Sequence, residues 1–283
     1  MVSSIIKKLF ESSDIDVLGD STMTFPTWDC FKDWIDEASC PNFPSSKFGN
    51  QPIHNENNTL IPINAKPSLA SIIQGKEFVG IDVPVLLEPK ENKNGKTIII
   101  VGESPLRETD ENNNKEKILL GTPYAIHQKF DSPSQCNVYK KILNDLLRVG
   151  YSIYLTDIVK IWWKDTKLKY EEDYKTIFGK ELEELEKLGI QNSVIVAWGN
   201  SASGKLSKML SKKGKEFLKQ PHPSRNGWIH WKLRIFEKAV YVEKKIEYAT
   251  QRFPEKRNPT TEVIVANEVV KEILEYCRLT KAS

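Results

Sequence analysis

The sequence predicts an α/β fold, with a central four-stranded parallel sheet covered by helices on both faces in a three-layer α/β/α arrangement. Three observations lead to this expectation. From residue 96 onward, apolar runs of strand length alternate with amphipathic helical stretches. The runs have no polar face, as expected for parallel strands buried on both sides. A glycine or another turn-forming residue follows most of these runs, where a strand would pass into a loop.

The four strands are expected at residues 97–101, 152–159, 193–198 and 217–220. A capping box at Ser132–Gln135 begins the first helix, whose apolar stripe ends at Gly150. Further helices are predicted at residues 180–188, 205–210, 237–248 and 261–277. We therefore divide the chain into an N-terminal extension at 1–95, a core at 96–232 and a C-terminal helical tail at 233–283 that packs on the core. The extension is expected to be partly helical, at residues 27–38, where apolar residues recur at helical spacing.

The composition restricts the class of protein. Hydrophobic residues make up 39% of the 283 residues, which is enough to bury a core and argues against wholesale disorder. The net charge of +3 permits a nucleic-acid partner without requiring one. No apolar run is long enough to cross a membrane, and four scattered cysteines form no C-x-x-C pair. We expect a soluble, cytoplasmic monomer that uses no metal and no cofactor.

Ligands of parallel α/β sheets bind at the carboxyl ends of the strands. One such end is followed by Gly199–Lys205, which matches the G-x-x-x-x-G-K pattern of phosphate loops. Leu206 then replaces the hydroxyl residue that would hold Mg²⁺, which counts against a nucleotide-hydrolysing P-loop. The remaining interpretations are a helix N-terminus that places Ser201 and Ser203 near one phosphate, or an ordinary strand–helix turn.

Two other strand ends carry polar residues. His222 lies between two prolines and precedes Ser224, Arg225 and Asn226, a mixture that suits a phosphate backbone. The alternative is a hydrogen-bonded structural histidine. After the first strand, Gly102 permits a sharp turn, and Glu103 and Ser104 are placed to hold a water or a sugar oxygen. The alternative here is a surface turn with a solvated glutamate.

Taken in order, the motifs G-E-S-P, G-T-P-Y, T-D-I-V-K, V-A-W-G and H-P-S-R-N resemble those of the uracil-DNA glycosylase superfamily. The nearest likeness is to its iron–sulfur branch, which has a G-E-A-P-G loop. The resemblance covers Thr97–Trp231. It implies a uracil-DNA glycosylase-like fold and a hydrolase that flips a base out of single- or double-stranded DNA and cleaves its N-glycosidic bond with water.

The resemblance also implies roles for individual residues. His222 would donate a hydrogen bond to the departing base, and Glu103 and Ser104 would handle the attacking water. Tyr124 would stack on the flipped base, beside Asp157 and Gly102 in the base-binding set. The residues implied in gripping phosphate or probing the helix gap are Ser201, Ser203, Ser224, Arg225 and Asn226.

Three departures from the family pattern alter these expectations. Ile161 stands where the branch has a cluster cysteine, so no iron–sulfur cluster is expected. Asp157 replaces the asparagine that reads uracil; an ionised carboxylate only accepts hydrogen bonds and would repel uracil O4. Three alternatives are open for Asp157. It recognises a base with an amino group, or burial keeps it protonated. In the third alternative it pairs with a nearby Lys or Arg and reads no base. Ser104 replaces an Asp or Asn, a change for which Glu103, Glu108 or Asp110 would compensate.

These observations leave three functions open. The first is a DNA glycosylase that acts on a deaminated or damaged base. The second is a catalytically weak or inactive nucleic-acid-binding member of the same superfamily, and the third is a P-loop-like nucleotide hydrolase. A run of six lysines in residues 203–219 would flank a DNA groove in the first two cases, or is simply a solvated helix face.

Overall fold

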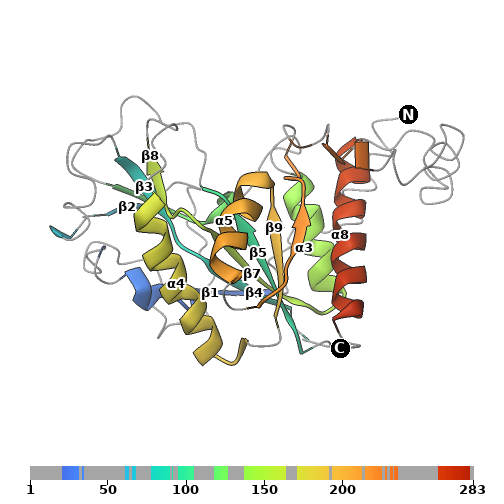
Figure 1. Cartoon of the computed structure of the whole chain (residues 1–283), viewed down its shortest axis with the longest axis horizontal. Helices are drawn as coiled ribbons and strands as arrows, with labels where there is room; N and C mark the ends of the chain where they lie inside the picture. The colour runs from blue at the N-terminus through green and yellow to red at the C-terminus, as the bar shows by residue number, and fades with distance from the viewer. Residues whose placement is uncertain are drawn as a thin grey trace, which may run out of the picture.

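The computed structural model shows a mixed α/β fold with two sheets and, in the residues it describes, four α-helices (Figure 1). The description is confined to residues 21–31, 34, 61–63, 66–67, 78–89, 91, 95–104, 118–126, 137–163, 171–190, 193–211, 214–224, 227, 230–231, 233–234 and 261–280. The predicted α/β class is therefore confirmed.

The larger sheet contains the four predicted strands side by side. They are β7 (Ser152–Asp157), β5 (Thr97–Gly102), β9 (Val194–Trp198) and β10 (Leu218–Gln220), in that order and all parallel. Two antiparallel strands extend this sheet beyond β7: β4 (Val85–Pro89) and then β1 (Ser21–Thr24). The expected four-stranded sheet is thus corrected to one of six strands. β1 is short and has a largely polar sequence, and the apolar part of β4 is only three residues long, Val85–Leu87, so neither was assigned to the sheet.

A second, four-stranded sheet was not anticipated. Its order is β2 (Ile61–Ile63), β6 (Ile118–Gly121), β3 (Phe78–Asp82) and β8 (Ile161–Trp163). Only β3 and β6 are parallel. Strands from residues 1–95 therefore belong to both sheets, and the expected N-terminal extension is built into the fold. The turn after β7 connects the two sheets, because β8 begins at Ile161.

Helices cover both faces of the larger sheet. On one face, α3 (Asn137–Arg148) and α8 (Thr261–Leu279) pack against Ile98 and Ile100 of β5. On the other, α4 (Glu171–Lys187) and α5 (Asn200–Leu210) pack against Ile99 and Val101 (Figure 1). Because successive residues of a strand point to opposite faces, one apolar run fills both cores.

The helix boundaries differ from the predicted ones. The helix expected at 180–188 begins nine residues earlier, at Glu171, and the one expected at 205–210 begins at Asn200. The C-terminal helix expected at 261–277 is present as α8, two residues longer. Within the expected helix at 27–38, the structure shows a 3-10 turn, η1 (Trp28–Phe31). The capping box and the helix expected at 237–248 lie outside the described residues. None of the helices in the described segments combines the length and apolar character needed to span a lipid bilayer.

A buried ion pair fixes the end of β7. Lys160 and Glu181 are 1% and 0% exposed, and Lys160 Nζ lies 2.5 Å from Glu181 Oε2. Glu181 Oε1 also accepts hydrogen bonds from Thr156 Oγ1 at 2.6 Å and from Tyr154 Oη at 2.7 Å. Removing one member of such a pair leaves the other charge buried and uncompensated. The network therefore attaches α4 to the strand end that carries Asp157.

We expect Lys160→Met to lower the free energy of unfolding by about 3–5 kcal/mol, because Glu181 would lose its cation in the protein interior. Lys187→Met removes a cation from the solvent-exposed Lys187–Glu184 pair and should leave the free energy of unfolding nearly unchanged. Urea denaturation at pH 7 measures both. Equal losses in the two variants would contradict the importance given to the buried pair.

Candidate functional site

The order of the parallel strands identifies where a ligand site is expected. From β5 the chain reaches β7 through α3 on one face of the sheet. It then returns past β5 to β9 and on to β10, through α4 and α5 on the other face. The crossover direction changes at β5, so the loops that leave β5 and β9 diverge to opposite faces. Open α/β sheets bind ligands in the crevice outside such a switch point.

Glu103 lies at this switch point and is held from α5. Its Oε1 accepts a hydrogen bond from Ser201 Oγ at 2.5 Å and is paired with Lys205 Nζ at 3.4 Å. Ser201, expected to contact phosphate, is therefore a partner of the glutamate. Only Gly199 separates β9 from α5, and residues 200–205 are helical. This run does not form the open loop that a P-loop requires.

Ser203, also expected to contact phosphate, is buried in the first turns of α5. It is 8% exposed, and its backbone N–H donates to Gly199 O at 3.0 Å inside the first turn of α5. Ser104 is half-buried directly after Glu103. Arg225 and Asn226, expected to grip DNA, lie outside the described residues, as do Glu108 and Asp110.

Gly102, Asp157 and Tyr124 meet at one point, as the resemblance implies for the base-binding set. Gly102 and Asp157 are register partners at the ends of β5 and β7. A Cβ added to Gly102 would lie 2.1 Å from Asp157 Oδ1 and 2.6 Å from Tyr124 Oη. No residue with a side chain fits there without displacing one of these two groups. The carboxylate and the phenol therefore lie over the bare backbone of Gly102.

Tyr124 has unusual backbone and side-chain environments. It lies in the short helix η4 (Pro123–Ala125) with φ 56° and ψ 18°, a left-handed conformation that is uncommon for a residue other than glycine. Its Oη is buried and has no hydrogen-bond partner in the described part of the chain. Burial, followed by the charge of Asp157, raises the pKa of Tyr124 well above its usual value. The side chain is therefore a neutral phenol at physiological pH.

Four aromatic rings gather at this edge of the sheet. The Tyr124 centroid lies 4.8 Å from that of Tyr139, 5.3 Å from that of Trp198 and 6.1 Å from that of His222. Tyr139 from α3 also lies 6.0 Å from His222. Sequence analysis gave no role to Tyr139, whose place in the helix resembles an ordinary core position. The ring expected to stack on a base is thus already packed against Tyr139.

The hydrogen bonds of His222 determine its tautomer. The backbone N–H of Ser224 donates to Nδ1 at 3.3 Å, and Ser224 Oγ lies 2.8 Å from the same nitrogen. Because Nδ1 accepts, the neutral ring carries its proton on Nε2. Burial lowers the pKa of His222 to about 4, against a smaller opposing effect of Glu103. Among the described residues Nε2 has no hydrogen-bond partner, so the N–H remains available to a ligand.

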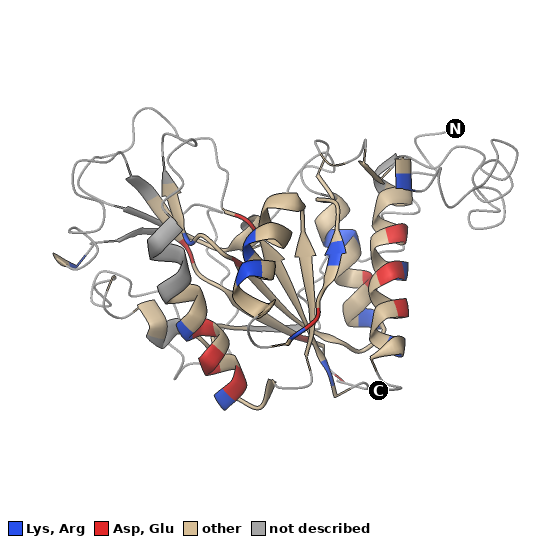
Figure 2. Ribbon diagram, in the orientation of Figure 1, with Lys and Arg blue, Asp and Glu red and all other residues tan. Residues whose placement is uncertain are grey.

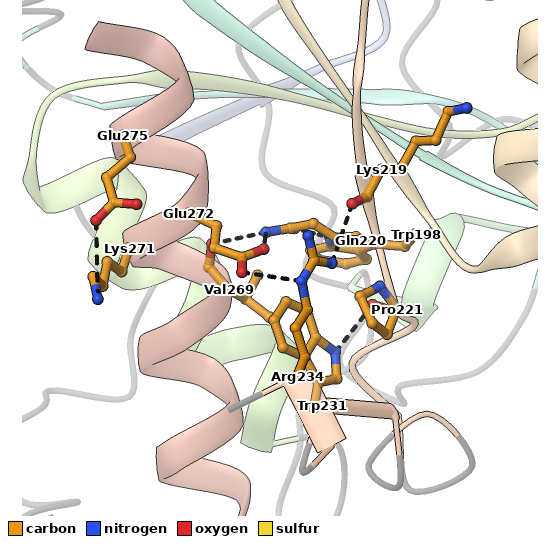
Figure 3. A network of polar contacts seen from close by, with 10 residues as sticks. All are labelled: Trp198, Lys219, Gln220, Pro221, Trp231, Arg234, Val269, Lys271, Glu272 and Glu275. Atoms are coloured by element: carbon orange, nitrogen blue, oxygen red, sulfur yellow. Dashed lines mark hydrogen bonds and ion pairs between the residues drawn. The ribbon is translucent and has the colours of Figure 1, made fainter. Parts of the chain in front are cut away.

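Polar contacts connect Trp198, one member of the ring cluster, to α8 through Gln220 (Figure 3). Trp198 Nε1 donates to Gln220 Oε1 at 3.1 Å. The amide nitrogen of Gln220 donates to Val269 O and to Glu272 Oε2, each at 3.2 Å, which fixes its orientation. Arg234 completes the set by pairing with Glu272 at 3.3 Å. The C-terminal helix thereby sets the position of the Trp198 ring.

The loop that carries His222 is closed by a close backbone approach. Trp231 Nε1 donates to Pro221 O at 3.0 Å, and Gly227 N–H donates to Ser224 O at 2.8 Å. A Cβ on Gly227 would lie 1.8 Å from His222 O. Only glycine fits at this position, so Gly227 is a structural determinant of the site that the motif reading left without a role.

The described residues contain no group of three or more His, Cys, Asp or Glu side chains able to hold a metal ion. No protein-family model matches the sequence, and no curated protein matches it significantly.

We expect Gly227→Ala to lower the free energy of unfolding by about 1–3 kcal/mol, because the new methyl group overlaps the His222 carbonyl. Gly204→Ala is the matched control. It lies on α5 with no atom within 4 Å of an added Cβ, and should stabilise the protein by up to about 1 kcal/mol. Urea denaturation of both variants gives the comparison, and a neutral Gly227→Ala would disprove the close approach.

The lowered pKa of His222 predicts a pH dependence of stability. Between pH 6.5 and about 4 the unfolded chain binds a proton that the folded chain does not, so the free energy of unfolding decreases as the pH falls through this window. The decrease should reach about 2–3 kcal/mol near pH 4. Urea denaturation at several pH values should show a weaker dependence in His222→Gln than in the wild type. The exposed-residue control His230→Gln should keep the wild-type slope, and the same slope in all three proteins would refute the prediction.

Proposed function

We propose that this chain is a metal-independent DNA N-glycosylase with a uracil-DNA glycosylase-like three-layer core. It flips a base into the site and cleaves the N-glycosidic bond with water. One observation carries the proposal: Gly102, Tyr124, Asp157 and His222, which come from four separate motifs, lie near one another at the carboxyl ends of the parallel strands of the larger sheet. The order of those motifs along the chain supports the same conclusion.

The chemical demand is the control of charge. As the bond between C1′ and the base nitrogen breaks, its electron pair goes to the base, and the sugar becomes positive. A preorganised hydrogen-bond donor at the departing base is worth a few kcal/mol in such a transition state. His222 supplies a neutral donor at Nε2, oriented by its hydrogen bonds from Ser224. We assign it the stabilisation of the anionic base.

We assign the orientation and deprotonation of the attacking water to Glu103. Ser201 and Lys205 hold its Oε1, which gives the carboxylate a defined position at the switch point. A carboxylate there orients a water toward C1′ and lowers the energy of the positive sugar. The water oxygen forms the new bond to C1′, and the proton it loses passes to the carboxylate. We assign Ser104, the next residue in the chain, a second contact to this water.

The DNA backbone is proposed to lie along α5 and the segment that follows it. Figure 2 shows basic residues on α5, the helix that begins directly after the carboxyl end of β9. Of these lysines, Lys208 and Lys219 are exposed, whereas Lys205 and Lys215 pair with glutamates. Exposed lysines attract phosphate without reading sequence. Ser224 adds a hydroxyl beside His222.

A second candidate is a nucleic-acid-binding protein of the same fold with weak or no catalysis. The packing of Tyr139 against Tyr124 favours it, because a stacking base would need that space. Asp157 favours it as well, since a carboxylate is a poor reader of uracil.

The test is base release from single- and double-stranded oligonucleotides that carry uracil, hypoxanthine, xanthine, cytosine or a mismatch. We expect release from at least one of them, reduced roughly 10²–10³-fold in His222→Ala, because the leaving base loses its donor. The exposed His230→Ala serves as the matched control and should keep the wild-type rate. Salt-dependent DNA binding without base release would favour the second candidate. Release that is equal in wild type and His222→Ala would exclude the assigned role of the histidine.

A further inference from the structure

The polar groups over Gly102 form a pair with opposite hydrogen-bonding character. Asp157 is 4% exposed, and its carboxyl group, when ionised, only accepts hydrogen bonds. Tyr124 Oη is buried, keeps its proton and has no hydrogen-bond partner among the described residues. An unsatisfied buried hydroxyl is costly and is found in native structures where a ligand or water completes it. The pair therefore calls for a ligand that donates to one group and accepts from the other.

The two groups lie close enough to contact one ligand edge. They are 2.1 Å and 2.6 Å from a common point, the Cβ position of Gly102. Asp157 has another interaction in the protein, but a carboxylate offers about four lone-pair sites, so one further donor can be accepted. A base edge with an amino group beside an unprotonated ring nitrogen meets both demands. Its amino group donates to Asp157, and its ring nitrogen accepts from Tyr124 Oη.

Resting on the function proposed above, we propose that Asp157 and Tyr124 Oη are specificity-determining residues that select cytosine-type bases over uracil. Cytosine presents N4–H₂ as a donor, N3 as an acceptor and O2 as a second acceptor. His222 Nε2–H is the donor available for O2. Adenine also has an amino group beside an unprotonated ring nitrogen, but it has only a C–H where cytosine has O2. The three protein groups Asp157, Tyr124 Oη and His222 therefore favour a pyrimidine.

Uracil has the opposite pattern at the two positions that matter. Its O4 would face the Asp157 carboxylate, oxygen against oxygen. Its N3–H would face the phenol hydroxyl, which would have to give up its role as donor. A site whose buried polar groups are left unpaired by the wrong ligand discriminates strongly against it.

The shielding of Tyr124 Oη places a condition on binding. Since this atom is closed to solvent in the free chain, an entering base has to displace a neighbouring side chain. Tyr139, whose ring lies 4.8 Å from that of Tyr124 and whose Oη lies 3.5 Å from His222 Nδ1, is the neighbour that an entering base would displace.

The experiment measures binding separately from cleavage. The full-length protein is titrated against fluorescent single-stranded oligonucleotides with one 2′-fluoro-2′-deoxycytidine or one 2′-fluoro-2′-deoxyuridine. Fluorine withdraws electrons from the sugar and disfavours its positive charge, so the base stays attached. Anisotropy then gives the ratio of the two affinities, which we expect to favour cytosine. Tyr124→Phe should reduce this ratio about tenfold, as the loss of one hydrogen bond to a buried group predicts.

Asp157→Asn should reverse the ratio in favour of uracil, because an amide can donate to O4 and accept from N3–H. Tyr151→Phe, a buried tyrosine beside the opposite end of β7, is the control and should keep the wild-type ratio. Circular dichroism confirms that each variant is folded. A wild-type ratio of one, or one that favours uracil, overturns this inference whatever the variants do. A preference for cytosine without base release from the cleavable oligonucleotides supports the inference and counts against the glycosylase activity instead.

Discussion

The missing side chain of Gly102 is the constraint on which the site depends. At the ends of β5 and β7 a methyl group on this residue would occupy the space of Asp157 Oδ1 and Tyr124 Oη. The strand end is therefore covered by functional groups from two other segments. The ring cluster follows from this placement, since Tyr124 then lies beside Tyr139, Trp198 and His222.

Buried polar contacts support this edge from both faces of the sheet. From the α4 side, Glu181 binds Lys160 and Thr156, on either side of Asp157. From the α8 side, Glu272 orients Gln220, which in turn fixes the indole of Trp198. Low-dielectric networks of this kind are rigid when their members are satisfied. The site is consequently held by elements that were expected only to cover the sheet, including the C-terminal helix.

The sequence predicted the parts of the fold whose signal is continuous. The parallel strands β5, β7 and β9 were identified because each contains a run of apolar residues, as Ile98–Val101 illustrates. The second sheet was not predicted because its strands are only three to five residues long, too short to show a recognisable pattern of alternating apolar and polar residues. The motif order singled out Gly102, Asp157, Tyr124 and His222, and these four residues lie near one another in the structure. The partners of Glu103, the tautomer of His222 and the position of Tyr139 depend on contacts between distant segments, which a single sequence does not display.

The left-handed backbone of Tyr124 has a consequence for how this protein can change over time. Asparagine or glycine adopts such a conformation at lower cost, so replacing the tyrosine would relieve local strain. The same replacement would remove the ring and the hydroxyl from the edge of the sheet. Selection for thermal robustness and selection for ligand recognition thus act in opposite directions on one position. A lineage that abandoned the recognition role would be expected to drift toward the relaxed residue there first.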